Sequence, residues 1–108
     1  MEKRKDLCMV ITTFDKEEEM THVIDKLLSQ KLAACIQTTN IKSHYIWENE
    51  TCHDSEIRVI IKTKWEKVEE VSSIIKAMHS YQVPEIIAIN IDQSDELYAK
   101  WMDDSIPI

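Results

Sequence analysis

Residues 79–85 bring an imidazole, a phenol and a carboxylate together directly ahead of an apolar run. The segment reads His-Ser-Tyr-Gln-Val-Pro-Glu, and residues 86–91 after it predict a buried strand. Pro84 fixes its own φ at about −65° and biases Val83 toward extended backbone, so the segment should be ordered. Such a cluster at the start of a strand can bind a ligand or a cation, but it names no reaction.

Three residues are candidate metal ligands. His79 offers an imidazole, which suits copper and zinc, and Met78 beside it offers a thioether that suits Cu(I). Cys35 offers a thiol on a strand expected to be central. Two structural alternatives stay open: His79 as a partly positive group at a helix C-terminus, and Cys35 as a small hydrophobic side chain in the core.

Cys52, His53 and Asp54 follow one another and look like a nucleophile, a base and an acid. Catalytic triads assemble in space and are seldom consecutive, so a solvated loop is the favoured interpretation. His53 together with Glu50 is a candidate for weak cation binding at the surface. Neither Cys8 nor Cys52 has a closely spaced second thiol, so no zinc site of paired cysteines is predicted.

Composition limits the classes of function. Acidic residues outnumber basic ones by 20 to 13, giving a formal net charge of −7. DNA binding depends on Lys and Arg that neutralise phosphates, so we expect no nucleic-acid partner and no anionic membrane surface, whereas cations are favoured. Glycine is absent, which excludes glycine-rich phosphate loops. Asn40, Asn49 and Asp92 are expected to take the positive-φ positions that glycine usually fills.

The chain length predicts the number of domains, and the cysteines indicate the cellular compartment. A chain of 108 residues fits one domain, here residues 1–108. Its three cysteines form no close pairs, which indicates a reducing cytosol. Neither a signal peptide nor an apolar run of bilayer length is predicted, so we expect a cytoplasmic location.

Hydrophobic periodicity predicts the elements that position these side chains. Strands are expected at residues 7–13, 32–39, 56–63 and 86–91, with a further extended segment at 41–48 and a polar turn at 49–54. Helices are expected from Asp15 to about residue 30, over 65–78, and from Ser94 through Met102. Ile41, Ser43, Tyr45 and Trp47 should share one strand face.

This order is β-α-β-β-α-β with one extra C-terminal helix. It predicts an α+β, ferredoxin-like fold, with an antiparallel sheet and both main helices on one face. The other face must meet water, a ligand or another subunit. Several strands are apolar on both faces, and monomers avoid large exposed apolar patches, so self-association through that face is expected.

Four blocks of the sequence resemble the divalent-cation tolerance proteins of the CutA family, in order and in spacing. They are residues 32–35 (Leu-Ala-Ala-Cys), 43–48 (Ser-His-Tyr-Ile-Trp-Glu), 61–64 (Ile-Lys-Thr-Lys) and 79–88 (His-Ser-Tyr-Gln-Val-Pro-Glu-Ile-Ile-Ala). Asn40 and Asn49 stand where the family usually has glycine. Thr12 and Met78 occupy two possible ligand positions of relatives, so the family's metal site does not transfer intact.

The resemblance implies a cytosolic homotrimer joined through its sheets and involved in the response to metal ions. It implies weak binding of copper or another divalent cation, no required cofactor and no catalysis. It also supports a cleft between subunits, for which the candidate residues are Tyr45, Trp47, Glu48, Lys62, Tyr81 and Glu85. Packing at a subunit boundary is the alternative role for the aromatic members of this set.

Three other functions compete with cation tolerance, and one of them, a durable trimer that anchors or chaperones another protein, has no sequence feature that tests it. A trimeric regulatory or signalling module would bind a small ligand in the intersubunit cleft, where Lys62, Lys64 and Arg58 would face an anion. An enzyme such as a small phosphohydrolase would need an arginine in an anion cradle. Arg4 lies in a charged tail and Arg58 in mid-strand, so we predict no enzymatic activity.

Overall fold

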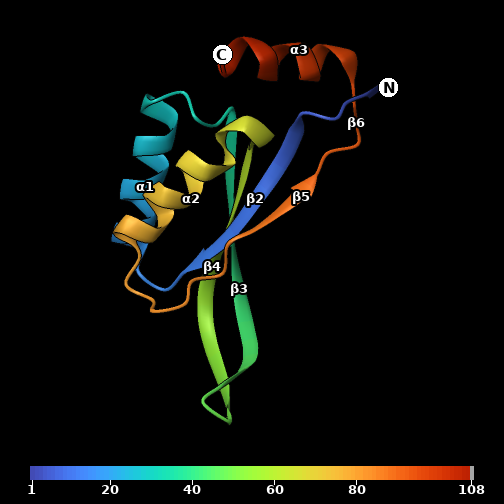
Figure 1. The fold of residues 1–108 in the computed structure, drawn as a ribbon. Helices are drawn as coiled ribbons and strands as arrows, with labels where there is room; N and C mark the ends of the chain where they lie inside the picture. The colour runs from blue at the N-terminus through green and yellow to red at the C-terminus, as the bar shows by residue number, and fades with distance from the viewer. Residues whose placement is uncertain (108) are drawn as a thin grey trace.

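A four-stranded antiparallel sheet carries two helices on one face (Figure 1). The computed structural model describes residues 1–107, and Ile108, the end of the predicted domain, lies outside them. The sheet strands are β2 (Leu7–Phe14), β3 (Cys35–Trp47), β4 (Glu50–Lys64) and β5 (Ile87–Asn90), in the spatial order β3-β4-β2-β5. The two helices are α1 (Glu17–Ser29) and α2 (Val68–Met78), and the 3-10 turn η1 (Trp65–Lys67) precedes α2.

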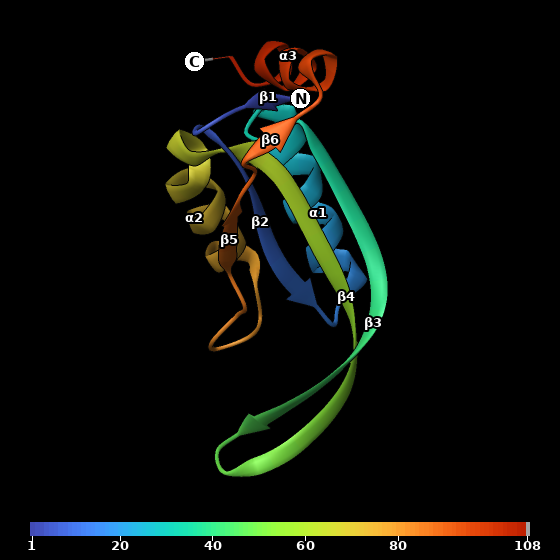
Figure 2. The same cartoon turned by 90° about the vertical axis from the view of Figure 1, so that its right-hand side faces the viewer.

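The remaining elements close one end of the sheet. A short pair, β1 (Glu2–Lys3) with β6 (Gln93–Ser94), was not expected from the sequence. Helix α3 (Glu96–Ser105) crosses above it, and the β3–β4 hairpin curves away at the opposite end (Figure 2). No helix among the described residues combines the length and the hydropathy needed to cross a bilayer.

The core lies between the sheet and the two helices. Val10, Phe14, Val59 and Ile61 point from β2 and β4 toward the helices and are fully buried. The helices meet them with apolar residues at three- and four-residue spacing: Met20, Val23 and Leu27 on α1, and Val71 and Ile75 on α2. Each such side chain contributes about 1.5–3 kcal/mol of burial free energy. The predicted α+β, antiparallel architecture with its extra C-terminal helix is confirmed.

The β3–β4 hairpin is longer and its turn tighter than predicted. The strand expected at 32–39 and the extended segment expected at 41–48 form one strand, and β4 begins at Glu50 within the expected polar turn. The turn itself is Glu48–Asn49, with φ of 50° and 66°, as a two-residue turn with a right-handed strand twist requires. Positive φ at Asn49 is therefore confirmed, whereas Asn40 and Asp92 do not adopt it and Lys31 does.

The three α-helices begin two or three residues later than predicted, at Glu17, Val68 and Glu96. Lys16, not Asp15, precedes α1, and no side chain caps that helix. Asp95 caps α3 by accepting from the backbone N–H groups of Leu97 and Tyr98 at 3.0 and 3.1 Å. The Ser94 hydroxyl does not cap the helix and instead donates to the carbonyl oxygen of Asp95 at 3.0 Å. Its neighbour supplies the carboxylate instead.

Strand β5 was predicted to be buried, and this prediction is wrong for the single chain. Ile87 and Ile89 are 49% and 43% exposed. Both pair with Ile11 and Met9 and so lie on the sheet face that the helices leave open, and the strand order places β5 at the edge of the sheet beside β2 alone. The apolar side chains of Ile87 and Ile89 are therefore not covered by other parts of the same chain.

Candidate ligand-binding site

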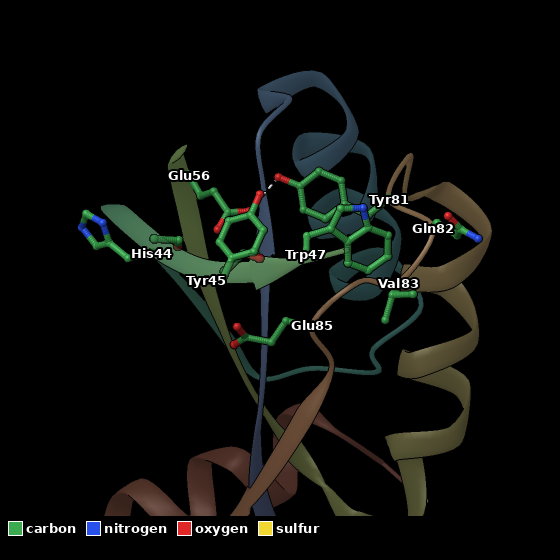
Figure 3. Close-up of a pocket in the computed structure, with 10 residues that line it drawn as sticks. His44, Tyr45, Trp47, Glu56, Tyr81, Gln82, Val83 and Glu85 are labelled. Atoms are coloured by element: carbon green, nitrogen blue, oxygen red, sulfur yellow. Dashed lines mark hydrogen bonds between the residues drawn. The ribbon is translucent and has the colours of Figure 1, made fainter. Parts of the chain in front are cut away.

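A pocket of about 600 Å³ lies where the outer part of the β3–β4 hairpin faces the segment that joins α2 to β5 (Figure 3). Its wall combines aromatic rings with carboxylates and contains no Lys or Arg. The lining residues are Thr13, Ser43, His44, Tyr45, Trp47, Glu56, Tyr81, Gln82, Val83 and Glu85. The pocket therefore favours neutral or cationic ligands over anions.

The two-residue period of β3 builds one side of the pocket. Ser43, Tyr45 and Trp47 alternate with outward residues and lie opposite Asp54, Cys52 and Glu50 in the ladder. The prediction that these side chains share one face is confirmed by their place in the pocket wall. Tyr45 and Trp47 are each 41% exposed, so their rings stay available to a ligand or to another chain.

Tyr81 and Glu56 form the polar centre of the pocket. The Tyr81 phenol donates a hydrogen bond of 2.6 Å to Glu56 Oε2 (Figure 3). Burial, and then this bond to the carboxylate, raise the pKa of Tyr81 far above its usual value. Tyr81 is therefore a protonated donor throughout the physiological range, and it fixes the orientation of the Glu56 carboxylate.

Tyr45 makes a similar contact in an exposed setting. Its phenol donates to Asp54 on the neighbouring strand. The hydrogen bond to Asp54 raises the pKa of Tyr45 to about 12. The contact holds the Tyr45 ring across the mouth of the pocket and keeps its hydroxyl protonated.

His79 organises the segment rather than facing the pocket. Its ring stacks on Phe14, with centroids 4.3 Å apart and planes 13° apart. Nε2 lies 2.6 Å from the carbonyl oxygen of Thr13, and the backbone N–H of Tyr81 lies 3.1 Å from Nδ1. A carbonyl only accepts and an N–H only donates, so Nε2 carries the proton and Nδ1 accepts. Both ring nitrogens are thus engaged within the chain.

Of the three predicted metal ligands, Cys35 lies away from the adjacent pair Met78 and His79. Met78 packs against the core, and Cys35 lies opposite Lys62 on β4. Thr13, whose carbonyl oxygen contacts His79, pairs with Arg58 on β4. Arg58 lies four residues from Lys62, the partner of Cys35, so these two positions on β4 are about 13 Å apart. Among residues 1–107, no three His, Cys, Asp or Glu side chains gather as a metal centre. Cation binding at His79, Met78 or Cys35 stays a prediction.

The predicted cleft residues divide into two groups. Four of them, Tyr45, Trp47, Tyr81 and Glu85, line the pocket together. Glu48 lies at the hairpin turn, and the ammonium of Lys62 lies 3.3 Å from the hydroxyl of Tyr98 on α3, so neither reaches the wall.

Sequence reasoning missed Glu56, which lines the pocket and is only 9% exposed. A signal was present, because Glu56 pairs with Ile41 and so shares the face that carries Tyr45 and Trp47. Extending the predicted strand pairing by a few residues would have placed this carboxylate among the aromatic side chains.

Comparison with known proteins identifies relatives over nearly the whole chain. The family model described as CutA1 divalent ion tolerance protein matches residues 8–105. The divalent-cation tolerance protein CutA of Pyrococcus horikoshii is 36% identical, over 89% of this chain and 94% of the relative. The solved structure described as the periplasmic divalent cation tolerance protein CutA from Archaeoglobus fulgidus superposes with a TM-score of 0.89. It is 36% identical and covers 94% of this chain and 99% of its own.

A plant relative, described as chloroplastic protein CutA of Arabidopsis thaliana, is 34% identical over 90% of this chain and 54% of its own length. The names of two relatives point to different compartments, the periplasm for the Archaeoglobus fulgidus protein and the chloroplast for the Arabidopsis thaliana protein.

Proposed function

Because the chain belongs to the CutA1 divalent ion tolerance family, we propose that it supports tolerance of divalent cations as a cytoplasmic homotrimer. In this proposal it binds copper or another divalent cation weakly and catalyses no reaction. The observation that carries the proposal is the bare, apolar face of the sheet, which the helices leave open.

The open face supports assembly. Met9, Ile11 and Ile60 lie on it half-buried, and Ile87 and Ile89 extend it to the edge of the sheet. Monomers rarely expose a contiguous apolar surface of this kind. Two further copies of the chain would cover it, and each copy would bring its hairpin close to the pocket of another.

The negative charge of the protein supports cation binding, and the absence of clustered ligand side chains in the described residues explains why that binding would be weak. The net charge of −7 draws cations toward the protein. Glu56 and Glu85 add carboxylates to a pocket without a basic residue. No three ligand side chains gather within the described part of one chain, so a bound ion would keep several waters and exchange readily.

Growth under metal stress tests the proposal. Cells that lack their own relative of this protein would express the chain and grow in graded copper, zinc or cobalt. We expect the chain to restore growth, and the double substitution Ile87→Glu with Ile89→Glu to abolish the effect by charging the open face. Leu28→Glu is the matched control, because Leu28 is 44% exposed on α1, away from that face. Growth that does not change on expression of the chain would contradict the proposal.

The pocket favours one alternative, a trimeric regulatory module that binds a small ligand. Three aromatic rings and two carboxylates around about 600 Å³ can hold an amine or another organic cation by cation–π and ionic contacts. An anion is disfavoured, since Lys64 pairs with Asp103 at 3.0 Å and Arg58 lies outside the lining. A thermal-shift panel of amines, nucleotides and organic acids distinguishes these classes, because a ligand of the native state raises the melting temperature.

The cytoplasmic part of the proposal is supported by three free cysteines, at positions 8, 35 and 52. Cell fractionation with an antibody against the chain tests it. Detection of the protein in the periplasm or in an organelle would contradict the cytoplasmic location but not the tolerance function.

A further inference from the structure

Two histidines face each other across the hairpin, and one of them, His44, is also among the residues that line the pocket. His44 on β3 lies directly opposite His53 on β4 in the ladder. Their Nδ1 atoms are 2.7 Å apart, and the ring centroids are 4.9 Å apart with an interplanar angle of 69°. Both residues are exposed, and the His44 ring points away from Trp47 and Tyr81 (Figure 3).

The distance between the two Nδ1 atoms indicates that they share a hydrogen bond. At 2.7 Å, one Nδ1 carries the hydrogen and donates it while the other accepts. The pair therefore presents one proton held between two nitrogen lone pairs. A divalent ion can take the place of that proton if the first ring shifts its hydrogen from Nδ1 to Nε2. Both imidazoles then remain neutral, and no net proton is released.

The geometry is close to that of a two-nitrogen chelate. Metal–nitrogen bonds of about 2.0–2.1 Å at an angle of 90–110° require the nitrogens to be about 2.9–3.4 Å apart. The observed 2.7 Å needs an increase of a few tenths of an Å, which small rotations of the exposed rings provide. The backbone ladder already fixes both histidines on one face, so little ordering remains to oppose binding.

We propose that His44 and His53 form a two-imidazole site that binds a divalent transition-metal ion through both Nδ1 atoms. The inference rests on the proposed cation function and names its ligands. Imidazole selects copper, nickel and zinc over magnesium, and copper should bind most tightly of the four.

The surroundings of the pair account for modest affinity. On the same hairpin face the neighbouring cross-strand pairs are Lys42 with Ser55 and Ile46 with Thr51, and neither pair brings a carboxylate to the imidazoles. Asp54 points to the other face and accepts from Tyr45. Water completes the coordination, and the ion exchanges with the solution. Such a site suits capture of excess cations better than permanent storage of one.

Titration with copper tests the site directly. Isothermal titration of the full chain with CuCl₂ should give one ion per chain, and the nitrogen couplings in the copper electron paramagnetic resonance spectrum should show two equivalent imidazoles. His44→Gln and His53→Gln should each raise the Kd at least tenfold and leave a single nitrogen coupling. His22→Gln is the matched control, since His22 is also exposed, on α1, and should leave the Kd unchanged.

Two outcomes separate this inference from the proposed function. Copper binding that stays unchanged in the His44→Gln, His53→Gln double variant would overturn the histidine pair and leave the cation function intact at another site. Absence of binding of copper, nickel, zinc and cobalt by the unmodified chain would overturn both. Equal binding of MgCl₂ and CuCl₂ would also overturn the pair, because magnesium prefers oxygen ligands. Circular dichroism of each variant shows that the fold is retained.

Discussion

Replacement of Tyr81 by Phe tests whether the hydrogen bond at the centre of the pocket stabilises the protein. The change removes one oxygen and keeps the ring, so Glu56 loses the donor at 2.6 Å while packing is preserved. Glu56 is 9% exposed, and water can replace the lost donor only in part. A hydrogen bond to a charged group contributes about 1.5–3 kcal/mol, so we expect a loss of about 2 kcal/mol in unfolding free energy. Urea unfolding followed by circular dichroism measures it.

Tyr45→Phe is the matched control for this experiment. It also removes a phenol that donates to a carboxylate, but Tyr45 and Asp54 are both exposed, so water can replace the lost donor and we expect a smaller loss of unfolding free energy than for Tyr81→Phe. All samples need the same protein concentration, because subunit association would make stability depend on it. If Tyr81→Phe lowered the unfolding free energy no more than Tyr45→Phe, burial would not strengthen the contribution of the Tyr81–Glu56 hydrogen bond to stability. That result would refute the prediction.

Further predictions concern titration and reactivity. The hydrogen bond from Arg4 holds the pKa of Asp103 below its usual value, so this pair stabilises the fold above about pH 4 and ceases to do so as pH falls through the lowered pKa. Asp103→Asn should therefore lower the unfolding free energy by about 1 kcal/mol at pH 7 and reduce its fall with decreasing pH below about pH 4. An unchanged dependence on pH in this range would refute the prediction. The pKa values of Tyr45 and Tyr81 are raised, so stability should fall as the solution passes from about pH 10 to 12, with phenolate absorbance appearing late; ionisation of both with free tyrosine would argue against their carboxylate bonds. Burial raises the pKa of the Cys8 thiol to about 11, so Cys8 should resist alkylation in the native state, and rapid labelling would contradict its burial.

Periodicity in the sequence was sufficient to predict the layers of the fold. The apolar spacing of α1 and α2 and the β-branched runs of β2 and β4 each satisfy one local rule, so the elements and their order could be recognised. The turn at Asn49 was also predictable, because few residues other than glycine accept positive φ easily.

The errors arose where distant parts of the chain decide the outcome. The exposure of β5 depends on the strand order, which no local pattern specifies. The role of His79 depends on Phe14 and Thr13, far away in sequence, which engage the ring on its face and at Nε2. The pairing of His44 with His53 depends on the register of the hairpin, and a shift by one residue would separate them. Pairwise contacts of this kind are fixed only by the folded backbone.

Sedimentation velocity of the purified chain at micromolar concentration tests the central proposal, that copies of the chain cover the open sheet face. The proposal predicts a single species of about 38 kDa, three times the mass of a 12.7 kDa chain. It also predicts that glutamate at both Ile87 and Ile89 breaks this species apart. A folded 12.7 kDa particle over the whole concentration range would contradict the trimer and the shared setting of the pocket.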